Sequence, residues 1–188
     1  MPEGKYMQKP KAKKLFFIIP LFIISTLLFA CSEEKPSKPA ADPDSPPNAI
    51  SISSKVIVDG DEIEFDAYNI EGDNYFKLRD LAYVLSRTEK QFDVGWDNKN
   101  DAITLTSGKL YTVTGGELAN RETENKYAAP TNSKIYLDGE EISLTAYNIE
   151  GNNYFNLTDI AQAFDFGVDW DREKNTIVID TGKSYKPQ

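Results

Sequence analysis

The chain has 188 residues, with 21 basic and 30 acidic side chains, so its formal net charge is −9. An acidic surface repels the phosphate backbones of nucleic acids, so we expect no nucleic-acid partner. The chain has no histidine and a single cysteine, which excludes Ser-His-Asp and Cys-His catalysis, histidine-ligated metal sites and a disulfide within the chain.

Residues 1–30 have the pattern of an export signal. Five lysines and one glutamate precede an apolar run from Leu15 to Ala30, and a basic segment followed by a short apolar segment is typical of signal peptides. As a helix the run would be about 24 Å long, which is short for a bilayer core of about 30 Å. We therefore expect a cleaved signal; an uncleaved membrane anchor is the alternative.

The signal ends in Leu28-Phe29-Ala30-Cys31, which resembles the lipobox of bacterial lipoproteins. That resemblance implies cleavage before Cys31 and acylation of Cys31 with fatty acids such as palmitate. Several acyl chains give stable membrane attachment, whereas one chain binds marginally. We therefore expect the mature protein on the outer face of the cell membrane. Without residues 1–30 it has 16 basic and 29 acidic residues and a net charge of −13.

Residues 31–52 are expected to form a tether. Five prolines occur between positions 32 and 50, together with serine, alanine and charged residues. Such a composition cannot build a core and favours a semi-extended chain.

The remainder of the chain contains an internal repeat. The segment SKVIVDGDEIEFDAYNIEGDNYFKLRDLA, from Ser54, aligns without a gap with SKIYLDGEEISLTAYNIEGNNYFNLTDIA, from Ser133. Likewise FDVGWDNKNDAITLTSGKLY, from Phe92, aligns with FGVDWDREKNTIVIDTGKSY, from Phe166. Roughly half of the aligned positions are identical, which indicates a tandem duplication. We predict repeats at residues 53–112 and 132–188, joined by a connector at 113–131. The segment YTVT, residues 111–114, which leads into the connector, is β-like.

Both repeats predict the same elements. Asp59-Gly60 and Asp138-Gly139 are strong two-residue hairpin turns, and AYNI and Tyr-Phe flank a second turn. A closing hairpin alternates apolar and polar residues, as expected for a sheet with one buried face. Between these parts the spacing becomes helical, at Leu78, Leu81, Ala82 and Leu85 and at Leu157, Ile160, Ala161 and Phe164.

The predicted fold class is α+β, with two tandem repeats. In each, a mostly antiparallel small sheet in the order β-β-β-β-α-β-β packs on one short helix. Asn156 is a favourable N-cap, whereas Lys77 predicts a weaker start for the first helix. A unit of about 55 residues is marginal as an independent domain, so we expect the repeats to pack together or to share strands.

The repeated pattern of the Asp-Gly turn, AYNI, NYF and F-x-V-x-W-D resembles the copper amine oxidase N-terminal-like domain, also called a stalk domain. Similar repeats are common in surface proteins of Gram-positive bacteria. In amine oxidases this domain lies away from the active site, and the copper ligands are histidines of another domain. The resemblance therefore implies neither copper nor a quinone cofactor here, and we expect no cofactor and no metal.

Aromatic residues are the first candidates for a binding site. Tyr68, Tyr75, Tyr147 and Tyr154 are possible contacts for a ligand or partner, because tyrosine often lies at a surface with its hydroxyl in water. Trp96 and Trp170 could also stack on sugars. The alternation of the closing hairpins instead predicts that both tryptophans belong to the core.

Acidic residues give weaker candidates. The segment from Asp97 to Asp101 is similar to a calcium loop but lacks the required glycine and distant glutamate, so a hairpin turn is favoured. A pair such as Glu71 and Asp80 could serve a glycosidase. However, Asp80 and Asp159 recur at the helix start, where an acid favours the helix N-terminus.

These observations predict a non-enzymatic, surface-displayed lipoprotein module that binds or spaces a partner at the cell envelope. Besides the membrane, the expected partners are a cell-wall polymer or an envelope protein. Alternatives are a glycan-binding module, a carboxylate-type enzyme that acts on wall glycan, and a solute-binding lipoprotein. Two units of this size leave little room for the closed cleft of a solute-binding protein.

Overall fold

The computed structural model describes residues 47–119 and 123–187. The predicted signal peptide, Cys31 and most of the predicted tether lie outside the described residues. Within them, no helix has the length and apolar character needed to cross a membrane.

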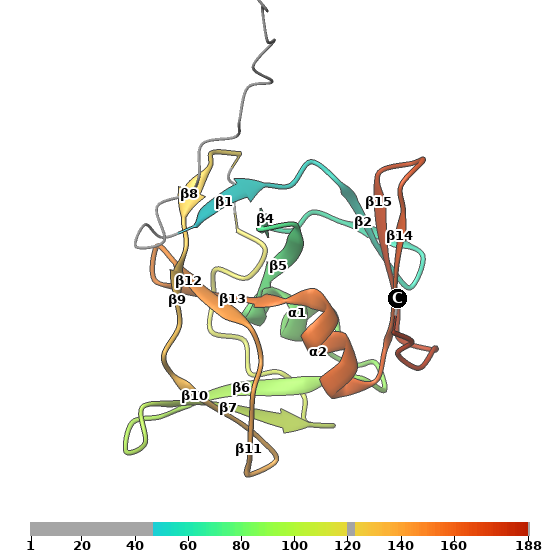
Figure 1. Cartoon of the computed structure of the whole chain (residues 1–188). Coiled ribbons are helices and arrows are strands. Elements are labelled where there is room, and N and C mark those ends of the chain that lie inside the picture. Colours follow the sequence, from blue (N-terminus) through green and yellow to red (C-terminus); the bar gives the residue numbers. More distant parts are fainter. Residues whose placement is uncertain (1–46, 120–122, 188) are drawn as a thin grey trace, which may run out of the picture. The chain divides into compact units, whose positions relative to one another are not determined.

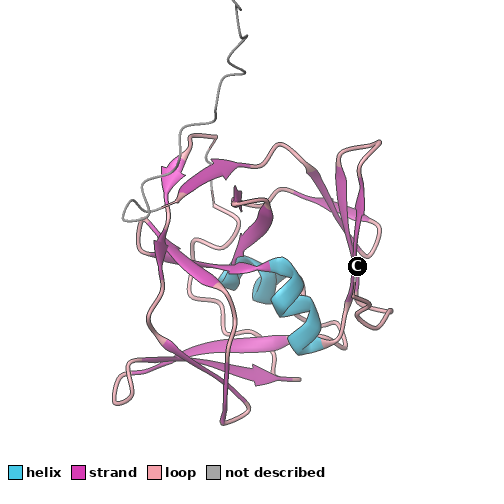
Figure 2. Ribbon diagram, in the orientation of Figure 1, coloured by secondary structure: helices cyan, strands magenta, loops and turns pink. Residues whose placement is uncertain are grey.

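The described chain is mostly sheet with two short helices (Figure 2), which confirms the α+β class. The helices are α1 (Leu78–Val84) and α2 (Leu157–Phe164). The strands are β1 (Asn48–Ser51), β2 (Lys55–Val58), β3 (Asp61–Ile63), β4 (Ala67–Ile70), β5 (Asp73–Lys77), β6 (Phe92–Asp97), β7 (Ala102–Ser107), β8 (Lys126–Tyr127), β9 (Ala129–Pro130), β10 (Lys134–Leu137), β11 (Glu140–Ile142), β12 (Ala146–Ile149), β13 (Asn152–Asn156), β14 (Gly167–Asp171) and β15 (Thr176–Asp180).

The strands form three sheets. The largest has seven strands in the order β8-β1-β4-β5-β13-β12-β9. At its centre β5 pairs with β13 in antiparallel register, with Phe76 opposite Phe155. The order of four strands, one helix and two strands occurs from β2 to β7 and again from β10 to β15. The seven-stranded sheet therefore joins the two halves of the described chain through β5 and β13.

The two smaller sheets also combine strands from both halves. Their orders are β11-β10-β7-β6 and β14-β15-β2-β3. In each, an early strand of one half pairs in parallel with the last strand of the other, as β10 does with β7 and β2 does with β15. These two parallel pairings depart from an otherwise antiparallel fold. Neither half completes its smaller sheet without the other.

The aspartates of the Asp-Gly turns stabilise these parallel pairings through side-chain hydrogen bonds. The Asp59 carboxylate accepts hydrogen bonds from the N–H and the hydroxyl of Thr181, both at 2.7 Å. The Asp138 carboxylate accepts from the N–H of Ser107 at 2.9 Å and from its hydroxyl. Each aspartate has a φ near +50°, at 50° and 52°, as an Asp-Gly hairpin turn requires. Each turn thus holds the end of a strand from the opposite half.

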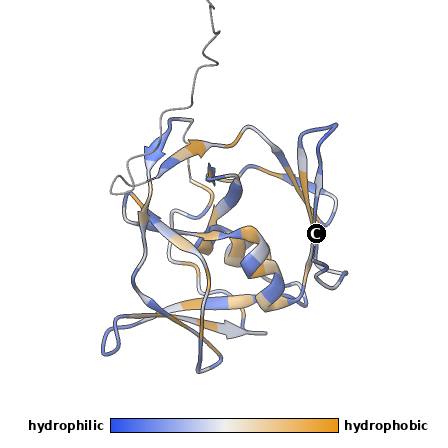
Figure 3. Ribbon diagram, in the orientation of Figure 1, coloured by the Kyte–Doolittle hydropathy of each residue, from blue (hydrophilic) through white to orange (hydrophobic). Residues whose placement is uncertain are grey.

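The helices pack against strands of all three sheets (Figure 1). The apolar positions predicted at helical spacing are buried in both helices. Phe164 of α2 stacks on Phe92 of β6, with ring centroids 4.1 Å apart, so the core is shared between halves. Burial of one such side chain stabilises the fold by about 1.5–3 kcal/mol. Figure 3 shows apolar residues on the helices and adjoining strands and hydrophilic residues at the hairpin tips.

The helix starts differ as the sequence predicts. The Asn156 side chain accepts hydrogen bonds from the N–H groups of Thr158 at 2.9 Å and Asp159 at 3.3 Å, which caps α2. Lys77 precedes α1 without a side-chain cap. A capped helix start is more stable by about 1 kcal/mol.

Two predicted boundaries are corrected. Residues 48–51 form strand β1 rather than the end of a tether, and Ala49 is fully buried. The segment that leads into the connector is not β-like, since residues 111–114 form no strand. Its later part supplies β8 and β9, which extend the seven-stranded sheet at both edges. Local composition did not predict these segments because their pairing partners are distant in sequence.

Candidate functional site

The two tryptophans are exposed, which corrects the prediction that they belong to the core. Trp96 and Trp170 are each 44% exposed. Along β6 the same face begins with the buried residues Phe92 and Val94, and burial decreases toward the hairpin tip. The alternation predicted the correct face but could not predict where the covering core ends.

The tyrosines predicted as surface contacts are buried or partly buried, which corrects that prediction. Tyr68, Tyr75 and Tyr154 are buried, and Tyr147 is partly buried. Tyr68 packs edge-to-face on Tyr154, with ring centroids 5.3 Å apart, and Tyr75 packs in the same way on Tyr147 at 5.1 Å. These rings form a small second core over the joined sheet. They therefore do not present a surface to a ligand.

One tyrosine hydroxyl is anchored inside this core. The Tyr154 hydroxyl donates a 2.6 Å hydrogen bond to Oδ2 of Asp66. Burial, followed by this bond to a carboxylate, raises the pKa of Tyr154 above its usual value. Tyr154 therefore stays protonated and acts as a structural donor between the two halves.

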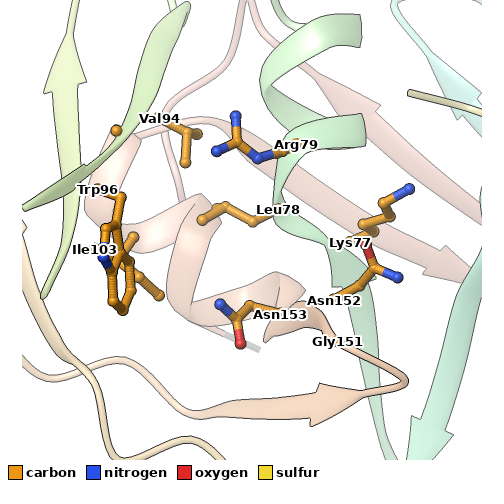
Figure 4. A pocket seen from close by; sticks show the side chains of 10 residues that line it. Lys77, Leu78, Arg79, Val94, Trp96, Ile103, Gly151, Asn152 and Asn153 are labelled. Carbon is orange, nitrogen blue, oxygen red and sulfur yellow. The ribbon is translucent and has the colours of Figure 1, made fainter. Parts of the chain in front are cut away.

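A pocket of about 250 Å³ lies beside Trp96 (Figure 4). Its walls come from the β6–β7 hairpin, the start of α1, and the turn that leads into β13. The site thus depends on residues from both halves. The lining residues are Lys77, Leu78, Arg79, Val94, Gly95, Trp96, Ile103, Gly151, Asn152 and Asn153.

Trp96 forms the aromatic side of this pocket. It is directly opposite Ile103 in the β6–β7 register, and Ile103 is buried. Figure 4 shows the indole ring beside Ile103, with Leu78 and Asn153 across the space from it. A flat ring that is supported from behind and open in front can stack on an apolar ligand face.

The two basic side chains that line the pocket differ in their hydrogen-bond and ion-pair partners. The Lys77 ammonium donates to the Gly116 carbonyl at 3.0 Å and lies 3.7 Å from the Asp80 carboxylate, and in Figure 4 it points away from Trp96. Arg79 makes a long 3.4 Å contact from Nη1 to the Tyr111 hydroxyl. Among the described residues Arg79 has no ion pair, so its guanidinium keeps donors for a ligand.

Polar groups complete the pocket. The Asn153 Oδ1 accepts a hydrogen bond from the Asn148 side-chain amide at 3.1 Å. That bond orients the Asn153 amide so that its NH₂ group points into the pocket (Figure 4). No carboxylate lines this pocket, whereas four other pockets described on residues 47–187 each include at least one.

The second hairpin presents its tryptophan differently. The Arg172 guanidinium lies over the Trp170 ring, 5.2 Å from its centroid, as in a cation–π pair. Where β6 has Gly95, β14 has Asp169, and where α1 has Arg79, α2 has Thr158. Trp170 lines none of the pockets described.

The acidic candidates do not form a reactive site. Asp80 is fully buried, and its Oδ1 accepts a hydrogen bond from the N–H of Leu118 at 3.1 Å. Burial raises the pKa of Asp80, which the Leu118 amide and Lys77 only partly offset. A substrate cannot reach this carboxylate, so Glu71 and Asp80 are not a glycosidase pair. The Asp80 side chain also binds the connector rather than the helix start.

The suspected calcium loop is a hairpin turn. The Asp97 carboxylate accepts from the N–H of Lys99 at 2.9 Å and from the Asn100 amide at 2.7 Å. In residues 47–119 and 123–187, no group of three or more Asp, Glu, Cys or His side chains could hold a metal ion.

Comparison with known proteins identifies the family. Residues 57–179 match the family model of the copper amine oxidase N-terminal domain. The match is a single one that extends across both halves, in agreement with the shared sheets. No curated protein and no solved structure matches the chain. In copper amine oxidases this domain is not the catalytic one. The chain belongs to the copper amine oxidase N-terminal domain family, which confirms the resemblance to that family.

Proposed function

We propose that this protein is a lipid-anchored module of the bacterial cell envelope that binds wall glycan without catalysing a reaction. The basic and apolar segments before Cys31 support export and anchoring. The net charge of −13 for the chain after residue 30 supports solubility outside the cell. The open pocket beside Trp96 is the single observation that carries the binding function.

We further propose that the folded part consists of two duplicated repeats that close on each other. The repeated element order, the central pairing of Phe76 with Phe155 and the reciprocal aspartate contacts support this. Phe76 and Phe155 occupy equivalent positions in the sequence alignment, as do Asp59 and Asp138. Equivalent residues therefore meet or exchange partners, as a two-fold arrangement requires.

A glycan fits the chemistry of this pocket. Sugar rings have an apolar face and a rim of hydroxyl groups. Trp96 can stack on the apolar face, and the Asn152 and Asn153 amides can form hydrogen bonds with the hydroxyl groups. The pocket volume is below the roughly 300–1,000 Å³ of sites for drug-sized ligands. It therefore suits one sugar residue of a longer polymer.

The binding function can be tested with the full-length protein purified from membranes in detergent. Insoluble cell-wall polymer should retain it, and Trp96→Ala should weaken retention about tenfold or more, as at other aromatic anchors. Trp170→Ala is the matched control, because Trp170 is equally exposed but lines none of the pockets described. Equal retention of all three proteins, or retention of none, would exclude this site and leave a spacer role.

The anchor needs a separate test. Cys31→Ser should release the protein from the membrane fraction or block processing of its signal. An unchanged mass and unchanged detergent partitioning would contradict acylation at Cys31. Because this measurement does not involve the pocket, the anchor and the binding site can fail independently.

A further inference from the structure

The pocket beside Trp96 also indicates which kind of sugar it takes, an inference that rests on the proposed glycan-binding function. We infer that the pocket binds an acidic sugar residue, with the ring against Trp96 and a carboxylate or phosphate group on Arg79. The first argument is charge. The chain after residue 30 has a net charge of −13, yet this pocket includes two basic residues and no acidic one.

Arg79 is the group suited to recognise the anion. Guanidinium presents planar donors that match carboxylate and phosphate oxygens. Among the described residues, the one hydrogen bond that the Arg79 guanidinium donates is long, at 3.4 Å, and goes to a neutral hydroxyl rather than to a carboxylate. That hydroxyl, on Tyr111, donates to Glu117 at 2.7 Å. This chain of contacts positions Arg79 and leaves most of its donors available.

Lys77 contributes little to this recognition. Its ammonium is held by Gly116 and Asp80 on the side away from Trp96. That contact offsets part of the charge of the buried Asp80. Recognition of the anion therefore depends on Arg79 alone, so a single substitution can remove it without removing the contact of the sugar ring with Trp96.

Among residues 123–187, the pocket beside Trp96 has no counterpart around Trp170 in the pockets described. Thr158 replaces Arg79, Asp169 replaces Gly95, and Arg172 lies over one face of the Trp170 ring. A carboxylate at position 169 would repel an anionic ligand. The inference therefore predicts one acidic-sugar site in each chain rather than two.

The site can be tested by titrating the full-length protein in detergent with three defined probes. The disaccharide of N-acetylglucosamine and N-acetylmuramic acid carries a carboxylate, and a teichoic acid fragment carries phosphate. The neutral probe is N,N′-diacetylchitobiose, called chitobiose below. We expect one acidic probe or both to bind, with one site per chain and at least about tenfold more tightly than chitobiose. Which of the two binds identifies the source of the anion.

Arg79→Gln should weaken binding of the acidic probe about tenfold or more and leave binding of chitobiose unchanged. Arg172→Gln is the matched control, because it removes the cation beside the other tryptophan. Failure of both acidic probes, chitobiose binding of equal strength, or an unaffected Arg79→Gln variant would overturn the inference. Retention on wall polymer that still depends on Trp96 would then preserve the proposed function with a neutral ligand.

Discussion

The β6–β7 and β14–β15 hairpins carry equivalent tryptophans with the same exposure of 44% but different surroundings. Trp96 borders a pocket with Arg79, whereas Trp170 has Arg172 over one face of its ring and Asp169 beside it in the strand. Exposure alone therefore does not identify a site. The difference arises from a few residues around each ring, since both hairpins belong to four-stranded sheets with a corresponding order of strands.

The largest expected effect is on the free energy of unfolding, and it tests whether the cores beneath the two hairpins contribute equally to stability. Phe92 and Phe166 start the two hairpins and are both fully buried. Phe92→Ala and Phe166→Ala should each lower the free energy of unfolding by about 3–5 kcal/mol, through lost burial and the cavity left behind. Denaturant unfolding should show one transition for each variant, since the sheets share strands. Two separate transitions would show that the halves unfold independently.

A smaller effect tests the contacts between halves. Asp59→Ala and Asp138→Ala should each cost about 1–3 kcal/mol, because each removes the acceptor of two hydrogen bonds from the opposite half. Asp101→Ala is the control, because Asp101 has a similar φ of 52° in the β6–β7 turn, while no hydrogen bond or ion pair joins its side chain to the other half within residues 47–119 and 123–187. Equal losses in all three variants would assign the effect to backbone strain.

A double substitution gives the first hairpin the carboxylate of the second. Gly95→Asp introduces the counterpart of Asp169, and Thr104→Ala is needed with it, because a Cβ at position 95 would lie 2.6 Å from Oγ1 of Thr104, an atom that alanine lacks. We expect the double variant to bind acidic sugar about tenfold more weakly than Thr104→Ala alone. Titration with the acidic probe measures this difference, and denaturant unfolding checks that both variants are folded. Thr104→Ala alone should retain binding.

The smallest effect concerns the buried acid at the first helix. The pKa of Asp80 is raised above its ordinary value of 3.8, chiefly by burial. A raised folded pKa means that its stabilising contribution is complete below the unfolded value and is lost as the pH rises through the folded value. Asp80→Asn should therefore flatten stability against pH above about 3.8 and gain up to about 1 kcal/mol at pH 7.

Thermal unfolding at a series of pH values would measure this change. Asp159→Asn is the control, because the Asp159 carboxylate is partly exposed and accepts a 2.7 Å hydrogen bond from Thr145. A steeper pH profile for Asp80→Asn than for the unmodified protein would contradict the assignment. Asp80→Ala should lose about 1–3 kcal/mol, since the Leu118 amide then has no acceptor.

Periodicity predicted the elements well and their partners poorly. Helical spacing located α1 and α2, and the Asp-Gly pairs located two hairpin turns. Local patterns do not specify which strands meet across long distances in the sequence, so β1, β8 and β9 were missed. The parallel pairings of β2 with β15 and β7 with β10 were not predicted either, because they also join strands that are distant in the sequence.

The site was predicted least well, for a physical reason. Tyrosine is amphipathic and its burial depends on a partner for its hydroxyl, which Asp66 provides for Tyr154 from the other half. Tryptophan at the end of an alternating strand is buried only if the core reaches that far. Arg79 was not singled out, because a lone cation in a helix gives no sequence pattern that separates a site from a solvated surface. The absence of Arg at the aligned position 158 is the difference that could have indicated it.

The pairing of β2 with β15 has a consequence for how the molecule forms. Val56 of β2 is opposite Ile177 of β15, so β2 cannot complete its sheet until β15, the last strand of the described residues, has been made. Closing so long a loop costs entropy before it gives any contact, which slows folding. During that interval the edge of β2 lacks its final partner and can pair wrongly with other chains. A chain whose sheet closes only after its C-terminal strand has been synthesised cannot complete its fold before that moment.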